Sequence, residues 1–172
     1  MSPKLSTRRL AALEWPLYRE LRLRSLADSP DAFRRTLEEE AAFPAAHWET
    51  RVLRAADSTR DLPLVAERSG DPVGLAWGRV DESTPDAAHL YQMWVAPEAR
   101  GEGVGRMLLQ AVVDWARGSN AETLSLGVTC GDTAATRLYR AAGFEPVGDT
   151  EPLRPGSELV AQPMTLRLEN RA

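Results

Sequence analysis

The sequence predicts an α+β fold, in which a mixed and mostly antiparallel central sheet is flanked by helices. Three observations favour this class. Apolar residues follow helical spacing in the first third of the chain, short strand-like runs separated by turn signals fill the middle, and helices and strands alternate from residue 103 onward. This order requires at least one parallel crossover, which we expect between the strands near residues 88 and 124.

Length and composition are those of an ordinary globular protein: 172 residues, of which 43% are hydrophobic and 27% charged. They predict a single domain, residues 1–172, with a core from about residue 5 to 169. The net charge of −4 argues weakly against a nucleic-acid-binding protein. No run approaches the ~18 apolar residues of a membrane span and no signal peptide is visible, so we expect a cytoplasmic protein that binds no membrane.

The supply of metal-binding side chains is small. The chain holds one cysteine, Cys130, and two histidines, His47 and His89. A lone cysteine forms no internal disulfide, which argues against a disulfide scaffold. So few thiols and imidazoles also make a cysteine or histidine metal cluster improbable, and we expect no metal.

The N-terminal part is predicted to be helical. The first helix is expected from residue 14 to 27, and it should end before Asp28-Ser29-Pro30 because proline disfavours helical backbone at the residue before it. A short polar helix is expected at residues 37–42. Pro44 then opens another helix at residues 45–56.

The middle of the chain is predicted to be an antiparallel meander. Strands are expected at residues 64–66, 73–80 and 88–95. Gly70-Asp71 and the polar residues 83–86 are typical turn sequences between them.

The period becomes helical again at residues 103–117, where apolar residues form one broad stripe that ends at Gly118. The remaining expected elements are a strand at 124–128, a helix at 133–142 with Gly143 just after it, and strands at 144–147 and 160–168. Pro163 lacks an N–H group, so it should place the last strand at an edge or a bulge, or shorten it.

A glycine-rich loop between residues 95 and 106 is the most informative segment, because a strand runs into it and a helix follows. The N-terminus of a helix offers unpaired N–H groups and partial positive charge, and glycines let a bulky anion approach them. The arrangement predicts a diphosphate site, with Arg100 and Arg106 adding charge. A tight turn without a ligand is the alternative. A dinucleotide site is disfavoured, because it expects G-x-G-x-x-G and position 106 is arginine.

Two motifs resemble those of the GNAT family of N-acetyltransferases. Arg100-x-x-Gly103-x-Gly105, preceded by Val95-x-Pro97, is similar to the acyl-CoA-binding motif of that family. Ala135-x-x-Leu138-Tyr139-x-x-x-Gly143-Phe144 resembles its second signature, about thirty residues further on. The element order from about residue 14 to 168 fits the family as well, so the resemblance covers most of the chain.

The resemblance implies an acetyl-CoA-dependent N-acetyltransferase that moves the acetyl group directly to a primary amine of a small molecule, peptide or protein. No metal and no covalent enzyme intermediate are implied. A β-bulge commonly parts the motif strand from the next strand, and the pantetheine arm runs along that strand. The implied CoA-binding residues are Met93, Trp94, Val95, Arg100, Gly101, Glu102, Gly103, Val104, Gly105, Arg106, Asp132 and Tyr139.

Tyr139 matches the family tyrosine near the thioester sulfur, which implies a general acid, since a phenol is protonated at neutral pH. Packing in the core is the alternative. His89 is a candidate general base, because Ala88-His89-Leu90 resembles the segment around a histidine of the arylalkylamine N-acetyltransferases. Strand alternation places it on one face with Tyr91 and Met93. A surface or packing histidine, with water as the base, is the alternative reading.

Two positions depart from the family pattern. Asp132 replaces an asparagine; it can cap the following helix but, when ionised, cannot donate a hydrogen bond. Glu102 replaces a residue that is often basic, and its carboxylate is unfavourable beside a diphosphate unless it points away. These departures keep a second hypothesis open, a non-catalytic CoA-binding or sensing module. A dinucleotide oxidoreductase is a distant third.

The acceptor is not identified by sequence. Trp77 and Trp94, on adjacent strands, are candidates to flank its site. The acidic run Glu38-Glu39-Glu40 indicates either a solvated helix face or contacts to a cationic substrate. The net negative charge hints that the acceptor side is acidic and fits a cationic amine. We expect a monomer or a homodimer.

Overall fold

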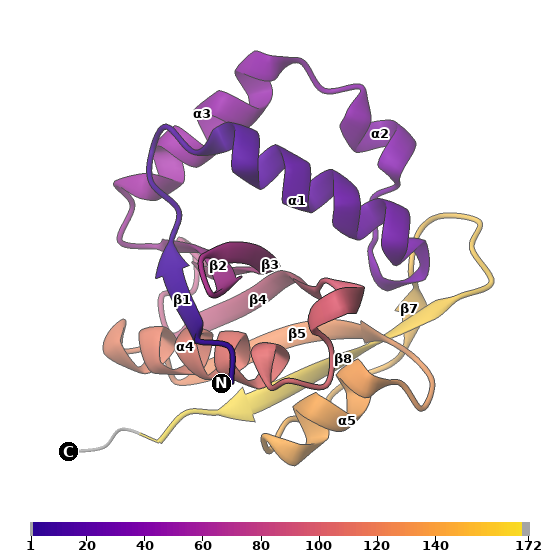
Figure 1. Cartoon of the computed structure of the whole chain (residues 1–172). Helices are drawn as coiled ribbons and strands as arrows, with labels where there is room; N and C mark the ends of the chain where they lie inside the picture. The colour runs from indigo at the N-terminus through magenta and orange to yellow at the C-terminus, as the bar shows by residue number, and fades with distance from the viewer. Residues whose placement is uncertain (1, 170–172) are drawn as a thin grey trace.

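The computed structural model describes residues 2–169, in which an eight-stranded mixed sheet carries helices on both faces (Figure 1). The strand order is β1-β2-β3-β4-β5-β8-β6, and β7 also pairs with β8. Only β4 and β5 pair in parallel among these strands, so the predicted α+β class with one parallel crossover is confirmed. The ends of the predicted domain, residues 1 and 170–172, lie outside the described residues.

The helices and strands have the following bounds. The α-helices are α1 Trp15–Asp28, α2 Leu37–Ala41, α3 Ala45–Ala56, α4 Val104–Gly118 and α5 Ala134–Ala141, with short 3-10 turns at Pro30–Ala32 and Pro97–Ala99. The strands are β1 Leu5–Arg9, β2 Asp61–Arg68, β3 Asp71–Val80, β4 Ala87–Val95, β5 Thr123–Thr129, β6 Glu145–Pro146, β7 Glu151–Pro152 and β8 Val160–Arg167.

One face of the sheet is covered by α1 and α3, with α2 beyond them (Figure 1). Tyr18 of α1 is fully buried, and its ring lies 5.6 Å from that of Trp48 in α3 and 5.3 Å from that of Trp77 in β3. These contacts fasten both helices to the sheet. The predicted N-terminal helices are confirmed to within a residue or two, and Thr36 begins α2 with a capping box completed by Glu39.

The other face packs against α4. An added methyl group on Gly78 of β3 would lie 2.9 Å from the Trp115 ring, so the helix approaches the strand as closely as it does because position 78 is glycine. Gly143 follows α5 with φ +100°, which confirms the expected glycine cap.

Two strands were missing from the sequence prediction. β1 is a polar edge strand, Leu5-Ser-Thr-Arg-Arg, which pairs with β2. It contains one apolar residue, so it shows no apolar alternation in the sequence. β7 has two residues. The turn after β2 is centred on Ser69 and Gly70, one residue earlier than expected.

Pro163 neither shortens β8 nor places it at an edge. It stands opposite Gly127 of β5, and its carbonyl accepts from the Val147 N–H on the opposite side. The N–H and C=O of one residue point to the same side of an antiparallel strand. The missing N–H therefore falls on the β6 side, and the pairing with β5 continues through the proline.

The site is positioned by a bulge in β4. Trp77 of β3 pairs with Tyr91, but Leu75 pairs with Trp94, so β4 has one extra residue between these pairs. Gln92 has φ +57°, which is unusual outside glycine. The parallel pairing with β5 stops at His89, and the two strands part beyond it. The structure thus contains the bulge and the parting that the resemblance implied.

Within residues 2–169 no helix has the length and apolar character needed to cross a bilayer.

Candidate active site

A cleft of about 1090 Å³ lies where β4 and β5 part. Its walls come from the end of α1 and the segment after it, from β3, β4 and β5, from the start of α5, and from β7. Tyr139, His89, Tyr91, Met93 and Trp77 all line it. The cleft therefore brings together residues that are up to 139 positions apart in the sequence, counting from 22 to 161.

The edge of β4 that faces β5 is available for pairing beyond the bulge. Gln92 is held in place because its Oε1 accepts a hydrogen bond of 2.7 Å from the Tyr18 hydroxyl. Residues 93–95 continue toward the glycine loop, while their other edge pairs with β3. An extended ligand can add to such an edge through its own amide groups.

The bulge also resets which side chains share a face. His89 and Tyr91 stack, with ring centroids 5.9 Å apart, as their alternation predicted. Met93 does not share their face: it packs toward α4, where its Cε lies 3.7 Å from a methyl group placed on Gly105. Trp94 takes the side of α1 instead, and its Nε1 donates to Asp28. The prediction was right for Tyr91 and wrong for Met93, because one extra residue inverts the alternation.

The glycine loop shapes the start of α4. Gly101 and Gly103 have φ of +80° and +93°, and Gly103 is the N-cap residue. The first N–H groups of α4 have no carbonyl one turn earlier to bond, and Gly103 provides no side-chain cap, so these N–H groups are available to an anion. Gly105 is needed for a different reason, since a methyl group there would lie 3.3 Å from Leu138 of α5.

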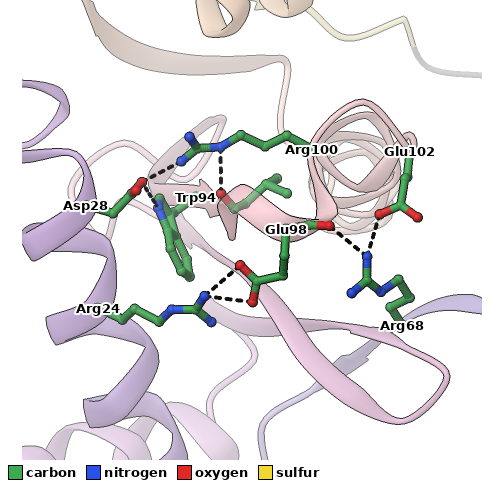
Figure 2. Close-up of polar contacts among 8 residues, drawn as sticks. Arg24, Asp28, Arg68, Trp94, Glu98, Arg100 and Glu102 are labelled. Atoms are coloured by element: carbon green, nitrogen blue, oxygen red, sulfur yellow. Dashed lines mark hydrogen bonds and ion pairs between the residues drawn. The ribbon is translucent and has the colours of Figure 1, made fainter.

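Charged residues around this loop are mostly paired with one another (Figure 2). Arg100 donates to the Val95 carbonyl at 3.0 Å and to the Asp28 carboxylate, which ties the loop to the end of α1. Glu102 pairs with Arg68 at 2.7 Å, so its charge is compensated beside the loop. Arg106 is exposed in the first turn of α4, and no ion pair involves it within residues 2–169.

Tyr139 reaches the cleft from α5 while only 7% of its surface is exposed. Its ring packs against Phe144 at 5.8 Å. Burial raises the pKa of the Tyr139 phenol above its usual value of about 10, so the group keeps its proton at neutral and moderately alkaline pH. The side chain is therefore a core residue whose protonated phenol lines the cleft.

Asp132 does not cap α5. Thr133 is the N-cap residue, and its Oγ1 accepts from the Thr136 N–H at 3.1 Å. Asp132 lies one residue further out, exposed, and pairs with Arg137 at 2.9 Å. The predicted capping role was wrong, because the extended backbone that a cap requires occurs at Thr133. Thr133, not Asp132, lines the cleft.

Of the residues expected near the acceptor, two tryptophans and an acidic run, only Trp77 lines the cleft. Trp77 lines the cleft, whereas Trp94 is 4% exposed and is not among the lining residues. Glu38 and Glu39 are exposed on α2 and Glu40 is fully buried against Arg22, so none of the three lines the cleft. The acidic run is thus a helix face and a buried ion pair.

Sequence reasoning did not single out the arginines of the cleft wall. Those that line the cleft are Arg22, Arg34, Arg35, Arg51 and Arg79. They come from α1, the segment after it, α3 and β3, so only the folded chain brings them together. Five acidic residues line the cleft as well, so its charge is mixed and an acidic acceptor side stays a prediction: Asp28, Asp31, Asp81, Glu82 and Glu151.

Comparison with known proteins agrees with this geometry. The model of the Acetyltransferase (GNAT) family matches residues 15–144. A mycothiol acetyltransferase of Sanguibacter keddieii is 38% identical over 85 residues, which is 47% of this chain and 27% of that protein. The chain spans less than a third of the length of the first curated relatives it matches.

Solved structures have the same fold. An acetyltransferase of the GNAT family from Streptococcus pneumoniae superposes with a TM-score of 0.81 at 20% identity, covering 96% of this chain and all of that one. The yncA protein of Salmonella typhimurium, solved with acetyl-CoA, has a TM-score of 0.71 at 22% identity over 98% of this chain and 96% of that one. With the family model covering most of its length and this fold around the cleft, the chain belongs to the GNAT family of acetyltransferases.

Proposed function

We propose that the protein transfers the acetyl group of acetyl-CoA directly to a primary amine. The observation that supports this most is the parting of β4 and β5 beside the glycine-capped start of α4, with Tyr139 facing the same cleft. A strand edge, an anion site and a proton donor are what acyl transfer from a thioester requires. The names of the similar proteins, a mycothiol acetyltransferase and a protein solved with acetyl-CoA, support the same reaction.

Two parts of the chain are proposed to hold acetyl-CoA. The backbone of Met93, Trp94 and Val95 pairs with the pantetheine arm, because that edge of β4 faces away from β3. The loop from Gly101 to Arg106 binds the diphosphate through N–H groups at the start of α4. Arg106 adds a positive charge, and the Arg68 contact compensates the carboxylate of Glu102.

The proposed reaction uses Tyr139 as general acid and His89 as general base. The amine nitrogen attacks the thioester carbonyl carbon, the C–N bond forms and the C–S bond breaks. Tyr139 gives its proton to the departing sulfur, since burial keeps the phenol protonated. His89 is the proposed base that takes the proton from the amine nitrogen, directly or through water, because it lines the cleft next to Tyr91.

The proposal is tested first by calorimetric titration with acetyl-CoA and CoA, followed by an assay of thiol release with a panel of amines. We expect binding and amine-dependent release. No binding by the folded protein at millimolar ligand contradicts the proposal, and binding without transfer to any amine favours the non-catalytic CoA-binding module instead.

Gly103→Ala and Gly118→Ala form a matched pair at the two ends of α4 for this titration. Gly103 has a left-handed backbone, which disfavours alanine, so its replacement should weaken acetyl-CoA binding about tenfold. Gly118 has no neighbour within 4 Å of an added methyl group, and its replacement should leave binding unchanged.

A further inference from the structure

The inner wall of the cleft carries two arginines that flank Tyr18. Arg22 follows Tyr18 by one turn of α1, and Arg51 projects from α3. Burial raises the pKa of the Tyr18 phenol, and both guanidinium groups oppose that rise. The guanidinium carbon of Arg51 lies 5.7 Å from the centroid of the Tyr18 ring. Arg22 has the buried Glu40 as its anionic partner, so Arg51 is the member of the pair that an added anion would neutralise.

Arg22 has a donor that the described chain leaves unused. The side chain is 4% exposed and lines the cleft. Its Nε donates to Glu40 at 2.7 Å, while its Nη1 and the Oε1 of Glu40 are both buried with no hydrogen-bond partner within residues 2–169. A buried donor without an acceptor costs free energy comparable to a lost hydrogen bond. A ligand that brings an acceptor to this wall removes that cost.

Arg51 is positioned without a carboxylate. Its guanidinium carbon lies 5.0 Å from the centroid of the Trp77 ring and 5.7 Å from that of Tyr18. No ion pair involves it among the described residues. Contact with two aromatic faces fixes the plane of the guanidinium while leaving its N–H edge for another partner.

Arg22 is compensated by the buried Glu40, whereas no acidic residue that lines the cleft forms an ion pair with Arg51 among the described residues. Asp28 and Glu82 are exposed and paired, with Arg100 and Arg60 respectively. The Asp81 carboxylate accepts two hydrogen bonds from Ser83. Asp31 and Glu151 are exposed. The acids therefore lie at the rim, where water screens them, whereas Arg22 and Arg51 are deeper.

We propose that the acceptor is a small amine that itself carries a carboxylate group, which Arg51 and the Nη1 of Arg22 bind. This deepens the proposed acetyl transfer and rests on it. A carboxylate presents two oxygens that match the N–H edges of guanidinium groups, and such charge-assisted bonds are the strong ones.

The position of the arginines limits the distance between the two groups of the acceptor. Trp77, beneath Arg51, pairs with Tyr91, the residue directly before the bulge. Tyr18, between the arginines, donates to Gln92 in the bulge itself. The carboxylate site is thus adjacent to the part of β4 where the strands separate and the reaction is proposed. Amine and carboxylate should accordingly be separated by few bonds, as in an amino acid.

The test is thiol release from acetyl-CoA with three matched sets of acceptors: the common amino acids, their amides and their decarboxylated amines, together with spermidine. We expect that kcat/KM for the best amino acid exceeds that for its amide and its amine by at least about tenfold. Faster transfer to amines without a carboxylate, or to spermidine, overturns the inference while leaving the proposed function intact. Transfer to no member of the panel by a protein that binds acetyl-CoA overturns it as well.

Two variants of α3 complete the test. Arg51→Gln should raise KM for the amino acid at least about tenfold and reduce its advantage over the decarboxylated amine, with acetyl-CoA affinity unchanged. Arg54→Gln changes an exposed arginine of the same helix that does not line the cleft, and should leave both constants unchanged. An equal effect of the two variants contradicts the assignment. If the unaltered protein does not bind acetyl-CoA at all, the proposed function is refuted instead.

Discussion

At the scale of single residues, Tyr139 combines a core position with a proposed catalytic role. Packing against Phe144 removes water from most of its ring, and this burial raises the pKa of a hydroxyl that is already protonated at neutral pH. Tyr139→Phe should preserve the packing and remove the proton donor. We expect kcat to fall by roughly 100-fold or more while the Kd for acetyl-CoA changes little, measured by steady-state kinetics and calorimetry. An unchanged kcat would remove Tyr139 from the mechanism.

The raised pKa of Tyr139 also predicts a pH dependence. A group with a raised pKa holds its proton to higher pH than the free phenol, whose pKa is about 10. The kcat profile should therefore rise as the acceptor amine loses its proton and then stay level through pH ~10. A fall in kcat centred well below that value, in a protein that remains folded, would assign the donor to another group.

At the scale of elements, the contact between α4 and β3 depends on Gly78. A methyl group at this position would lie 2.9 Å from Trp115, and the ring is confined by the sheet beneath it. Gly78→Ala should lower the free energy of unfolding by about 1–3 kcal/mol. Gly118→Ala, at the end of the same helix, meets no neighbour and should be neutral or stabilising by up to about 1 kcal/mol. Urea denaturation of both variants checks this, and equal stabilities would contradict the close contact.

The link between α1 and the glycine loop depends on Asp28. Its carboxylate accepts from the buried Trp94 Nε1 and from Arg100, and the Trp94 bond is the largest cause of its lowered pKa. Asp28→Ala leaves the Trp94 N–H without a partner, so we expect a loss of about 1–3 kcal/mol at neutral pH. Asp28→Asn retains an acceptor and should lose less.

The same contact predicts how acid affects stability. Because the folded pKa of Asp28 lies below the unfolded one, its stabilisation is full above the unfolded pKa of about 3.9 and is lost as pH falls through the folded value. The difference in stability between the original protein and Asp28→Ala should therefore shrink in acid. A difference that stays constant between pH 7 and pH 3 would show that the carboxylate charge is not involved.

Sequence reasoning found elements that have an apolar stripe or run, or that are bounded by proline and turn residues. α4 buries one clear stripe, and β2, β3 and β4 alternate with turns between them. β1 was missed because an edge strand needs little apolar surface, and four of its five residues are polar. The bulge at Gln92 was expected only from the family resemblance, because no local pattern reveals a feature of the register between β3 and β4.

At the scale of the whole molecule, the buried pair of Arg22 and Glu40 joins α1 to α2 beneath the cleft. Both side chains are almost fully buried, so removing one partner leaves an uncompensated charge. Glu40→Leu should destabilise the protein by about 3–5 kcal/mol, and the double variant Arg22→Met with Glu40→Leu should recover most of that loss. Thermal and urea unfolding check this, and a single variant as stable as the double one would contradict it.

The sequence revealed those parts of the candidate site that are contiguous in the chain and not those assembled by the fold. The glycine loop and the Tyr139 motif were visible, because each is contiguous in the chain. The arginine wall was not, since Arg22, Arg51 and Arg79 lie in three elements that meet only when α1 and α3 cover the sheet. Contacts between helices and sheet, which no local pattern encodes, thus determine the charge that the acceptor meets.

The short parallel pairing also divides the sheet mechanically. Three register pairs join the half made of β1 to β4 to the half made of β5 to β8, with α4 as the covalent connection between them. A ligand that adds to the free edge of β4 acts as an interior strand and bridges the two halves. Acetyl-CoA should therefore slow amide hydrogen exchange in both halves at once and raise the melting temperature with its concentration. The sheet would then be completed by the same molecule that supplies the acetyl group.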